Sequence, residues 1–182
     1  MADIDPIWKI TDPKSVVPHL TLRTWWSETG AGIDTRETPE AEIGVLENRY
    51  RVSLPHDFRE YLKLGAPKEE NWDAEDGNWW PVGRIKNIPD EYDHPVSEAI
   101  MRNAPKHLIF LDYSIWSWAW AISCADDETR GRVAVIGGLP DGYVADSFGE
   151  FVERYTTDWM SIRQVQAKPK PRRGFWSWLG RS

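Results

Sequence analysis

The chain has 182 residues, a single cysteine, and 29 acidic against 22 basic side chains, which leaves a net charge of -7. One cysteine excludes an internal disulfide and a four-cysteine zinc site, and it favours a reducing compartment. No apolar run approaches the ~20 residues that cross a bilayer, and the first residues do not resemble a secretory signal. We therefore expect a soluble, cytoplasmic protein with no membrane span.

Charge is unevenly distributed along the chain. Residues 163–182 hold six of the basic side chains and none of the acidic ones, so the remainder carries 16 basic against 29 acidic groups, a net charge of -13. An acidic body repels phosphate backbones and favours basic partners, so we expect no direct binding of nucleic acid. Solubility alone is the competing explanation for the acidity.

The N-terminal third predicts two helices after an extension. Residues 1–35 give no clear element, because Pro18 interrupts any helix opened at Asp12-Pro13, and we assign them to an N-terminal extension. Thr38-Pro39-Glu40 is typical of a helix start, followed at helical spacing by Ile43, Leu46 and Tyr50. A second helix is expected from Pro55 to Gly65, with an apolar stripe at Phe58, Tyr61 and Leu62.

The middle of the chain predicts a loop and then a strand rich in tryptophan. Residues 69–80 interleave carboxylates with indoles and indicate a loop; a short helix is expected over 95–103 and a buried strand over 108–111. From Ile115 to Ala121, tryptophan alternates with small residues. A strand of this pattern places Trp116, Trp118 and Trp120 on one face, as an aromatic wall.

The last third predicts a strand, a turn and a helix. Residues 132–136 form the strand, residues 137–142 the turn, and Ser147 with Glu150 is spaced as a capping box for the final helix. Short links between the strands favour an antiparallel meander. Helices, then strands, then a helix indicate an α+β domain.

Two motifs in this order resemble the SUKH superfamily. The run from Leu54 to Leu62 (Leu-Pro-His-Asp-Phe-Arg-Glu-Tyr-Leu) matches its second helix, and the run from Ser147 to Phe151 (Ser-Phe-Gly-Glu-Phe) matches its last one. The resemblance covers about residues 36–160. After the second helix the family usually has Asn-Gly-Gly, whereas this chain has Leu-Gly-Ala-Pro.

The resemblance implies a fold and a class of function. The fold is an antiparallel or mixed sheet of about six strands backed by helices, here over residues 36–162, with residues 163–182 as a basic C-terminal tail. Bacterial members are mostly immunity proteins that neutralise a toxin, and a fungal branch regulates cell-wall synthesis. The family brings no catalytic residues.

The residues themselves also give no sign of catalysis. The four histidines are scattered, no second cysteine joins Cys124, and no phosphate-binding loop is present. An apparent calcium loop at 73–77 has its glycine one position too early. We expect no enzyme, metal or cofactor.

Two features of the sequence could bind a partner. The first is the acidic aromatic loop with the tryptophan strand, because indoles anchor interfaces and carboxylates complement a basic surface; its candidate residues are Trp72, Asp73, Glu75, Asp76, Trp79, Trp80, Trp116 and Trp118. A core aromatic cluster beneath a solvated loop is the alternative.

The second feature is the tail, a Lys-Pro spacer followed by an aromatic plug. Its candidate docking residues are Arg172, Arg173, Phe175, Trp176 and Trp178. The plug could dock on the acidic body, bind a partner or an anionic membrane surface, or stay disordered.

The sequence thus predicts a non-enzymatic protein-binding module. The first hypothesis is an immunity protein that neutralises a toxin with a basic surface by stoichiometric binding. The second is a regulatory adaptor of envelope or cytoskeletal processes, which recruits its partner through the tail.

Overall fold

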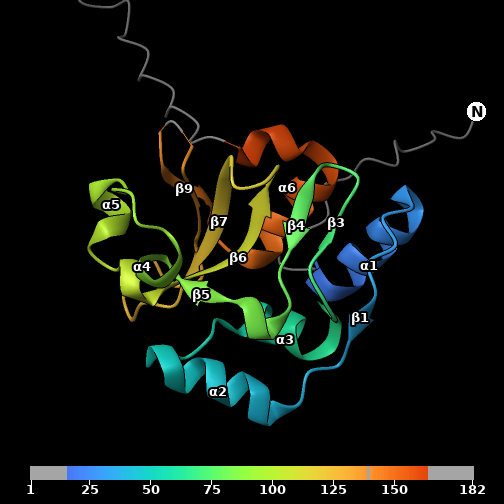
Figure 1. The fold of residues 1–182 in the computed structure, drawn as a ribbon, viewed down its shortest axis with the longest axis horizontal. Helices are drawn as coiled ribbons and strands as arrows, with labels where there is room; N and C mark the ends of the chain where they lie inside the picture. The colour runs from blue at the N-terminus through green and yellow to red at the C-terminus, as the bar shows by residue number, and fades with distance from the viewer. Residues whose placement is uncertain (1–15, 139, 164–182) are drawn as a thin grey trace, which may run out of the picture.

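A seven-stranded antiparallel sheet forms the centre of the computed structural model, which describes residues 16–138 and 140–163 (Figure 1). The strands are β3 (Asn71–Trp72), β4 (Gly77–Trp79), β5 (Lys86–Asn87), β6 (His107–Tyr113), β7 (Trp118–Ser123), β8 (Val133–Ile136) and β9 (Gly142–Ala145). Their order is β3-β4-β6-β7-β8-β9, and β5 also pairs with β6. A separate two-stranded sheet joins β1 (Thr35–Arg36) to β2 (Ala66–Pro67).

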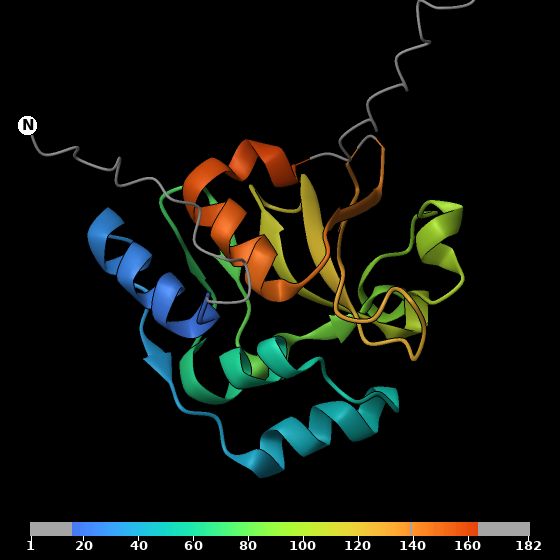
Figure 2. The same cartoon turned by 180° about the vertical axis from the view of Figure 1, so that it is seen from behind.

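Helices cover one face of the large sheet. The helices of the described residues are α1 (Pro18–Thr29), α2 (Glu40–Tyr50), α3 (His56–Gly65), α4 (Ile88–Glu91), α5 (Glu98–Met101) and α6 (Phe148–Asp158), with 3-10 turns η2 (Val82–Arg84), η3 (Ala104–Lys106) and η4 (Trp159–Ile162). Figure 2 shows α6 across this helix-covered face, with α1 beside it and α3 below. On the opposite face, the excursion through α4 and α5 lies against only part of the sheet (Figure 1). The predicted α+β class is confirmed.

Aromatic rings fill the space between the sheet and the helices. Phe58 of α3 lies 5.0 Å from Phe148 of α6, and Phe151 lies 5.3 Å from Phe110 of β6, all measured between ring centroids. These rings are at most 1% exposed. Such offset and edge-on pairs add dispersion and quadrupole attraction to the burial of large apolar areas. The core therefore depends on α3 and α6, the two helices whose motifs were recognisable in the sequence.

The structure adds a helix that the sequence did not predict. Pro18 occupies the first position of α1 and Gly30 ends it in the left-handed conformation, at φ 72°. Leu22 and Trp26 of this helix are 0% and 2% exposed. The expectation that Pro18 leaves residues 1–35 without a clear element is therefore wrong over α1, because a proline that cannot sit inside a helix is well suited to begin one. The assignment of residues 1–35 to an N-terminal extension stays a prediction.

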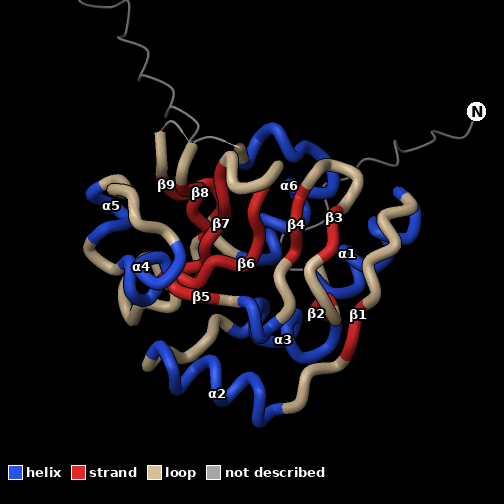
Figure 3. The backbone as a smooth tube through the Cα atoms, in the orientation of Figure 1, coloured by secondary structure: helices blue, strands red, loops and turns tan. Residues whose placement is uncertain are grey.

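Most other predicted boundaries agree with the structure. The helices α2 and α3 follow Pro39 and Pro55, and the Ser147 hydroxyl accepts a hydrogen bond from the Glu150 N–H at 3.0 Å, as the capping box predicts. The third helix is shorter than expected, since only Glu98–Met101 is helical. Residues 69–80, expected as a loop, contain the β3–β4 hairpin (Figure 3).

Candidate functional site

Asp73 shapes the tip of the β3–β4 hairpin from the inside. Its Oδ1 accepts hydrogen bonds from the backbone N–H groups of Glu75 and Gly77 at 2.9 Å each. Its Oδ2 accepts from the indole N–H of Trp79 at 2.7 Å and from the hydroxyl of Tyr155 at 2.6 Å. Burial raises the pKa of Asp73, and these donors oppose that rise. Asp73 is 7% exposed and fully engaged, so its assignment to a partner surface is corrected to a structural role.

The hydrogen bond from Tyr155 of α6 to Asp73 explains why a glycine follows the hairpin tip. A Cβ added at Gly77 would lie 2.0 Å from the Tyr155 hydroxyl oxygen, so only glycine lets the hairpin approach the helix this closely. Glu75 and Asp76 lie between these fixed points. Asp76 is exposed, Glu75 is half-buried, and neither carboxylate accepts a hydrogen bond from a described residue. The hairpin therefore holds at its tip two carboxylates that have no partner among the described residues.

Two of the predicted anchor tryptophans lie in the interior. Trp79 and Trp80 are both 0% exposed. The indole of Trp79 packs 5.2 Å from the ring of Tyr155, whereas that of Trp80 donates to Asp112 at 2.7 Å. Their predicted role in partner binding is wrong, because a neighbouring carboxylate here satisfies a buried indole N–H instead of marking a surface. Trp72, on the edge strand β3, is 41% exposed and remains a candidate.

The expected tryptophan strand begins three residues late. Ser114, Ile115 and Trp116 have φ angles of 44°, 55° and 62°, all left-handed, and they form a turn between β6 and β7. The Ser117 N–H closes this turn on the Tyr113 carbonyl at 2.9 Å. Asp112 Oδ1 accepts from the Trp116 N–H at 3.3 Å.

The turn separates Trp116 from Trp118 and Trp120, which share a face of β7 as expected, with ring centroids 6.3 Å apart. Trp116 stacks on Tyr92 with centroids 6.0 Å apart, on the face opposite the helices. Trp120 is buried against Phe151 at 5.7 Å, and the half-buried Trp118 stacks on Tyr113 at 4.1 Å. The prediction of one aromatic wall is therefore wrong for Trp116, because three left-handed residues reverse the chain before the strand begins.

The same turn places Ile115 in solvent. This side chain is 85% exposed, the largest exposure among the large apolar side chains of the described residues. The two hairpin tips lie side by side, since the Ser114 N–H donates to the Asp76 carbonyl at 3.0 Å, and both tips are at the upper end of the sheet in Figure 1. We call Trp72, Glu75, Asp76, Ile115 and Trp116 the tip surface. No sequence signal marked Ile115, which looked like an ordinary strand residue.

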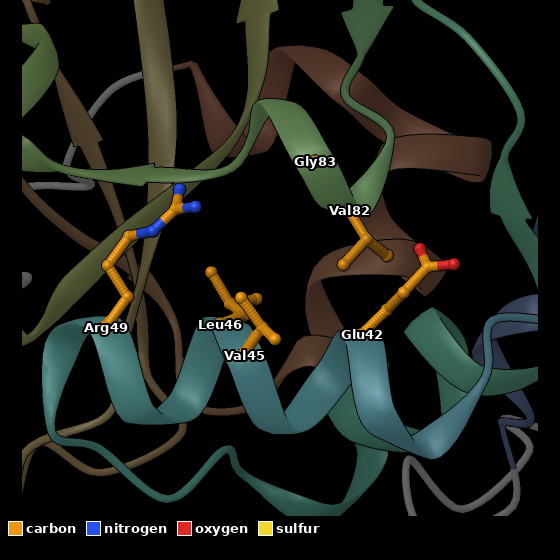
Figure 4. Close-up of a pocket in the computed structure, with 6 residues that line it drawn as sticks. All are labelled: Glu42, Val45, Leu46, Arg49, Val82 and Gly83. Carbon is orange, nitrogen blue, oxygen red and sulfur yellow. The ribbon is translucent and has the colours of Figure 1, made fainter.

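A groove between α2 and η2 is the main alternative site. Its cavity volume is about 140 Å³. In Figure 4, Glu42 and Arg49 stand toward opposite ends of the lining, with Val45, Leu46 and Val82 between them. Val45 is 58% exposed. The groove has an apolar floor without converging polar groups, and it therefore lacks the functional groups that catalysis requires.

Candidate catalytic groups do not converge among the described residues. Cys124 is buried, and burial raises its pKa to about 12, so its thiol stays protonated near neutral pH. His107 is 0% exposed and bonded to Asn103 and Tyr143. In the described part of the chain, no group of three or more His, Cys, Asp or Glu side chains is arranged to hold a metal ion. None of its helices has the length and apolar character needed to cross a membrane.

A comparison with protein families agrees with this arrangement. The model of the SMI1 / KNR4 family (SUKH-1) matches residues 37–154, which is more than half of the chain. The chain belongs to the SMI1 / KNR4 family. Membership supports a protein-binding role of the immunity or regulator type, and this SUKH-1 family is generally non-catalytic. A search of curated proteins gave no match.

The SUKH-1 match covers both hairpin tips and begins after α1. The match ends at residue 154, so Tyr155 and η4, like α1, lie outside it although they also contact the core beneath the tips. The predicted docking residues of the tail, from Arg172 to Trp178, lie outside the described residues. Trp72, Glu75, Asp76, Trp116 and Trp118 remain the surface-accessible candidates from the sequence, and the structure adds Ile115.

Proposed function

We propose that this SUKH-1 protein acts by stoichiometric binding of a toxin with a basic surface, which it holds on the tip surface. The observation that carries the proposal is Ile115, an 85% exposed apolar side chain on a left-handed backbone. The left-handed conformation costs roughly 1–2 kcal/mol for a residue with a Cβ. An exposed isoleucine recovers almost none of this through burial on folding. Strain without a folding benefit is characteristic of functional sites.

The surroundings of Ile115 favour a basic protein as the partner. An apolar centre within a polar rim is the usual organisation of a protein interface, and tryptophan is enriched among its strongest contacts. Trp72 supplies a second exposed apolar side chain, and Glu75 and Asp76 supply negative charge beside it. Carboxylates at the rim accelerate encounter with a basic surface, while the buried apolar contacts slow dissociation. Inhibition of this kind requires only that the toxin's active site be covered.

The test is capture of a partner by the full chain and by two single variants. Ile115→Asn removes the apolar anchor while keeping a residue that tolerates the left-handed region. Val45→Asn makes the same change at an exposed apolar residue beside the α2–η2 groove. The captured protein is then purified, and its affinity is measured by titration calorimetry.

We expect a 1:1 complex that Ile115→Asn weakens at least about 30-fold, as loss of an interface hot spot does, while Val45→Asn leaves the affinity within about twofold. We also expect co-expression to relieve the captured protein's toxicity. A loss confined to Val45→Asn would move the site to the groove. A captured protein without toxicity would replace the immunity role with the regulatory one.

A further inference from the structure

We infer that the C-terminal segment, residues 164–182, binds the tip surface of its own chain when no partner is present. The first support is the place where the described chain ends. The Ile162 carbonyl accepts the indole N–H of Trp120 at 2.8 Å, and the Arg163 guanidinium lies 4.9 Å from the ring centroid of Trp118. Residue 163 is therefore fixed at the upper end of the helix-covered face.

This end of the chain adjoins both hairpin tips. Trp118 is the strand partner of Tyr113, and Tyr113 in turn pairs with Gly77, the residue after Asp76. Neighbouring strands lie about 5 Å apart, so these pairings place the anchor of Arg163 within a few strand widths of Asp76 and Ile115. Five extended residues span up to ~17 Å and twelve up to ~40 Å. Lys168 and the aromatic residues from Phe175 onward can therefore both reach the tip surface.

Composition makes the segment complementary to that surface. Residues 164–182 contain five basic side chains and no acidic one, in the order of a Lys/Arg run followed by Phe175, Trp176 and Trp178. The tip surface offers two carboxylates, Glu75 and Asp76, that no described side chain pairs with, beside the exposed side chains of Ile115 and Trp72. A tether of this length produces an effective concentration on the order of millimolar, so even a weak contact is well populated.

The inference deepens the proposed function, because the segment would occupy the surface assigned to the partner. A basic partner must displace a basic segment of similar chemistry, and its apparent affinity is lowered by the fraction of molecules whose surface is covered. Self-binding would also cover Ile115 when the partner is absent. The segment thereby reduces the exposed apolar area that would otherwise favour aggregation.

The first experiment locates the segment in the full chain. Carbodiimide joins a lysine to a carboxylate only when the two are in direct contact, and mass spectrometry of the digested monomer identifies the linked pair. We expect Lys168 or Lys170 joined to Glu75 or Asp76 within one molecule, with a yield that falls in 0.5 M salt because charge attraction is screened. Links spread over all exposed carboxylates, or links found only in dimers, would overturn the inference.

The second experiment measures the protection that binding gives to the segment. Trypsin cleaves after Arg172 and Arg173, and the initial rate is followed by intact mass. Removing the tip charges with Glu75→Gln and Asp76→Asn should raise this rate at least threefold. The matched control is Glu37→Gln with Glu128→Gln, two exposed carboxylates that accept no hydrogen bond from a described residue. Equal rates in both double variants would show that the tip does not hold the segment.

The cross-linking and trypsin experiments use the free chain and need no partner, so their outcomes can be separated from the test of the proposed function. If Ile115→Asn abolishes partner binding while the cross-links are absent, the proposed function stands and the inference about the segment fails. If the cross-links form and a captured partner binds Ile115→Asn normally, the segment is placed correctly and the proposed function fails.

Discussion

The two faces of the large sheet are both rich in aromatic residues, yet they are closed in different ways. On the helix-covered face, Trp79 and Trp120 contact rings of α6, and a single buried carboxylate, Asp73, connects the hairpin to Tyr155. On the opposite face, polar groups hold the side chains together. There Asp112 accepts from the side chains of Asn78 and Trp80.

The two faces differ in how much stability is lost when one of their side chains is truncated. Ring-on-ring packing in a closed core leaves no solvent to fill a gap, so truncation there creates a cavity. The opposite face ends at the tip surface, where Trp116 is half-buried and Trp72 is exposed. We conclude that stability is concentrated on the helix-covered face and binding on the other.

The largest expected effect comes from Asp73. Asp73→Ala leaves four donors without their acceptor, two of them on side chains buried in the core. Each unsatisfied buried group costs about 1–3 kcal/mol, so we expect a loss of at least about 3 kcal/mol in the free energy of unfolding. Urea denaturation measures it. Asp112→Ala on the opposite face is the comparison: it leaves three donors without their acceptor, one of them on the half-buried Trp116, so we expect a smaller loss, and a larger loss there would contradict the division of roles.

The same Trp→Phe substitution on each face of the sheet tests whether stability is concentrated on the helix-covered face. Trp120→Phe replaces a buried indole with a smaller phenyl ring and leaves the Ile162 carbonyl without its indole donor. We expect the free energy of unfolding to fall by about 2–3 kcal/mol. Trp116→Phe changes a half-buried ring, and we expect less than about 1 kcal/mol. Chemical denaturation of both variants measures the two losses in the free energy of unfolding. Comparable losses would show that the turn is as important for stability as the core.

The smallest effect is a pH dependence from the opposite face. Burial lowers the pKa of His107 below its ordinary 6.5, so the unfolded chain binds more protons than the folded one just below pH 6.5. We expect stability to fall as pH decreases from 7.5 to 5.5, by at most about 1.4 kcal/mol over that whole range. Denaturation at the two pH values measures this. His107→Gln should reduce the slope, and an unchanged slope in this variant would contradict the assignment to His107.

The sequence was informative where local rules and the core agree. Prolines before two helices and the capping box at Ser147 predicted three helices, because these residues act on the backbone next to them. Their apolar stripes predicted the buried faces of α3 and α6. The motifs on these two helices also carried the resemblance to the family, because each combines a helix start with side chains that the core requires.

The candidate site was harder to predict, because its residues have the same local patterns as core residues. Trp79 and Trp80 beside carboxylates resembled an interface, although the carboxylates bond to them inside the protein. Alternation from Ile115 onward indicated a strand, and no glycine or asparagine marked the left-handed turn. A β-branched residue in that conformation depends on long-range contacts such as the one between Ser114 and Asp76, which a single sequence does not contain.

The tether between Asp73 and Tyr155 also bears on how duplicated copies of such a gene could acquire new partners. An insertion in the β3–β4 tip must preserve four hydrogen bonds to one carboxylate and a glycine with no room for a side chain. Among the described residues, the β6–β7 turn makes hydrogen bonds only within itself and to Asp76, Asp112 and Tyr113, and none of these reaches a helix. Diverging copies are therefore free to change residues 114–117 in length and chemistry first, while the neighbouring hairpin keeps its shape and supplies a constant acidic border.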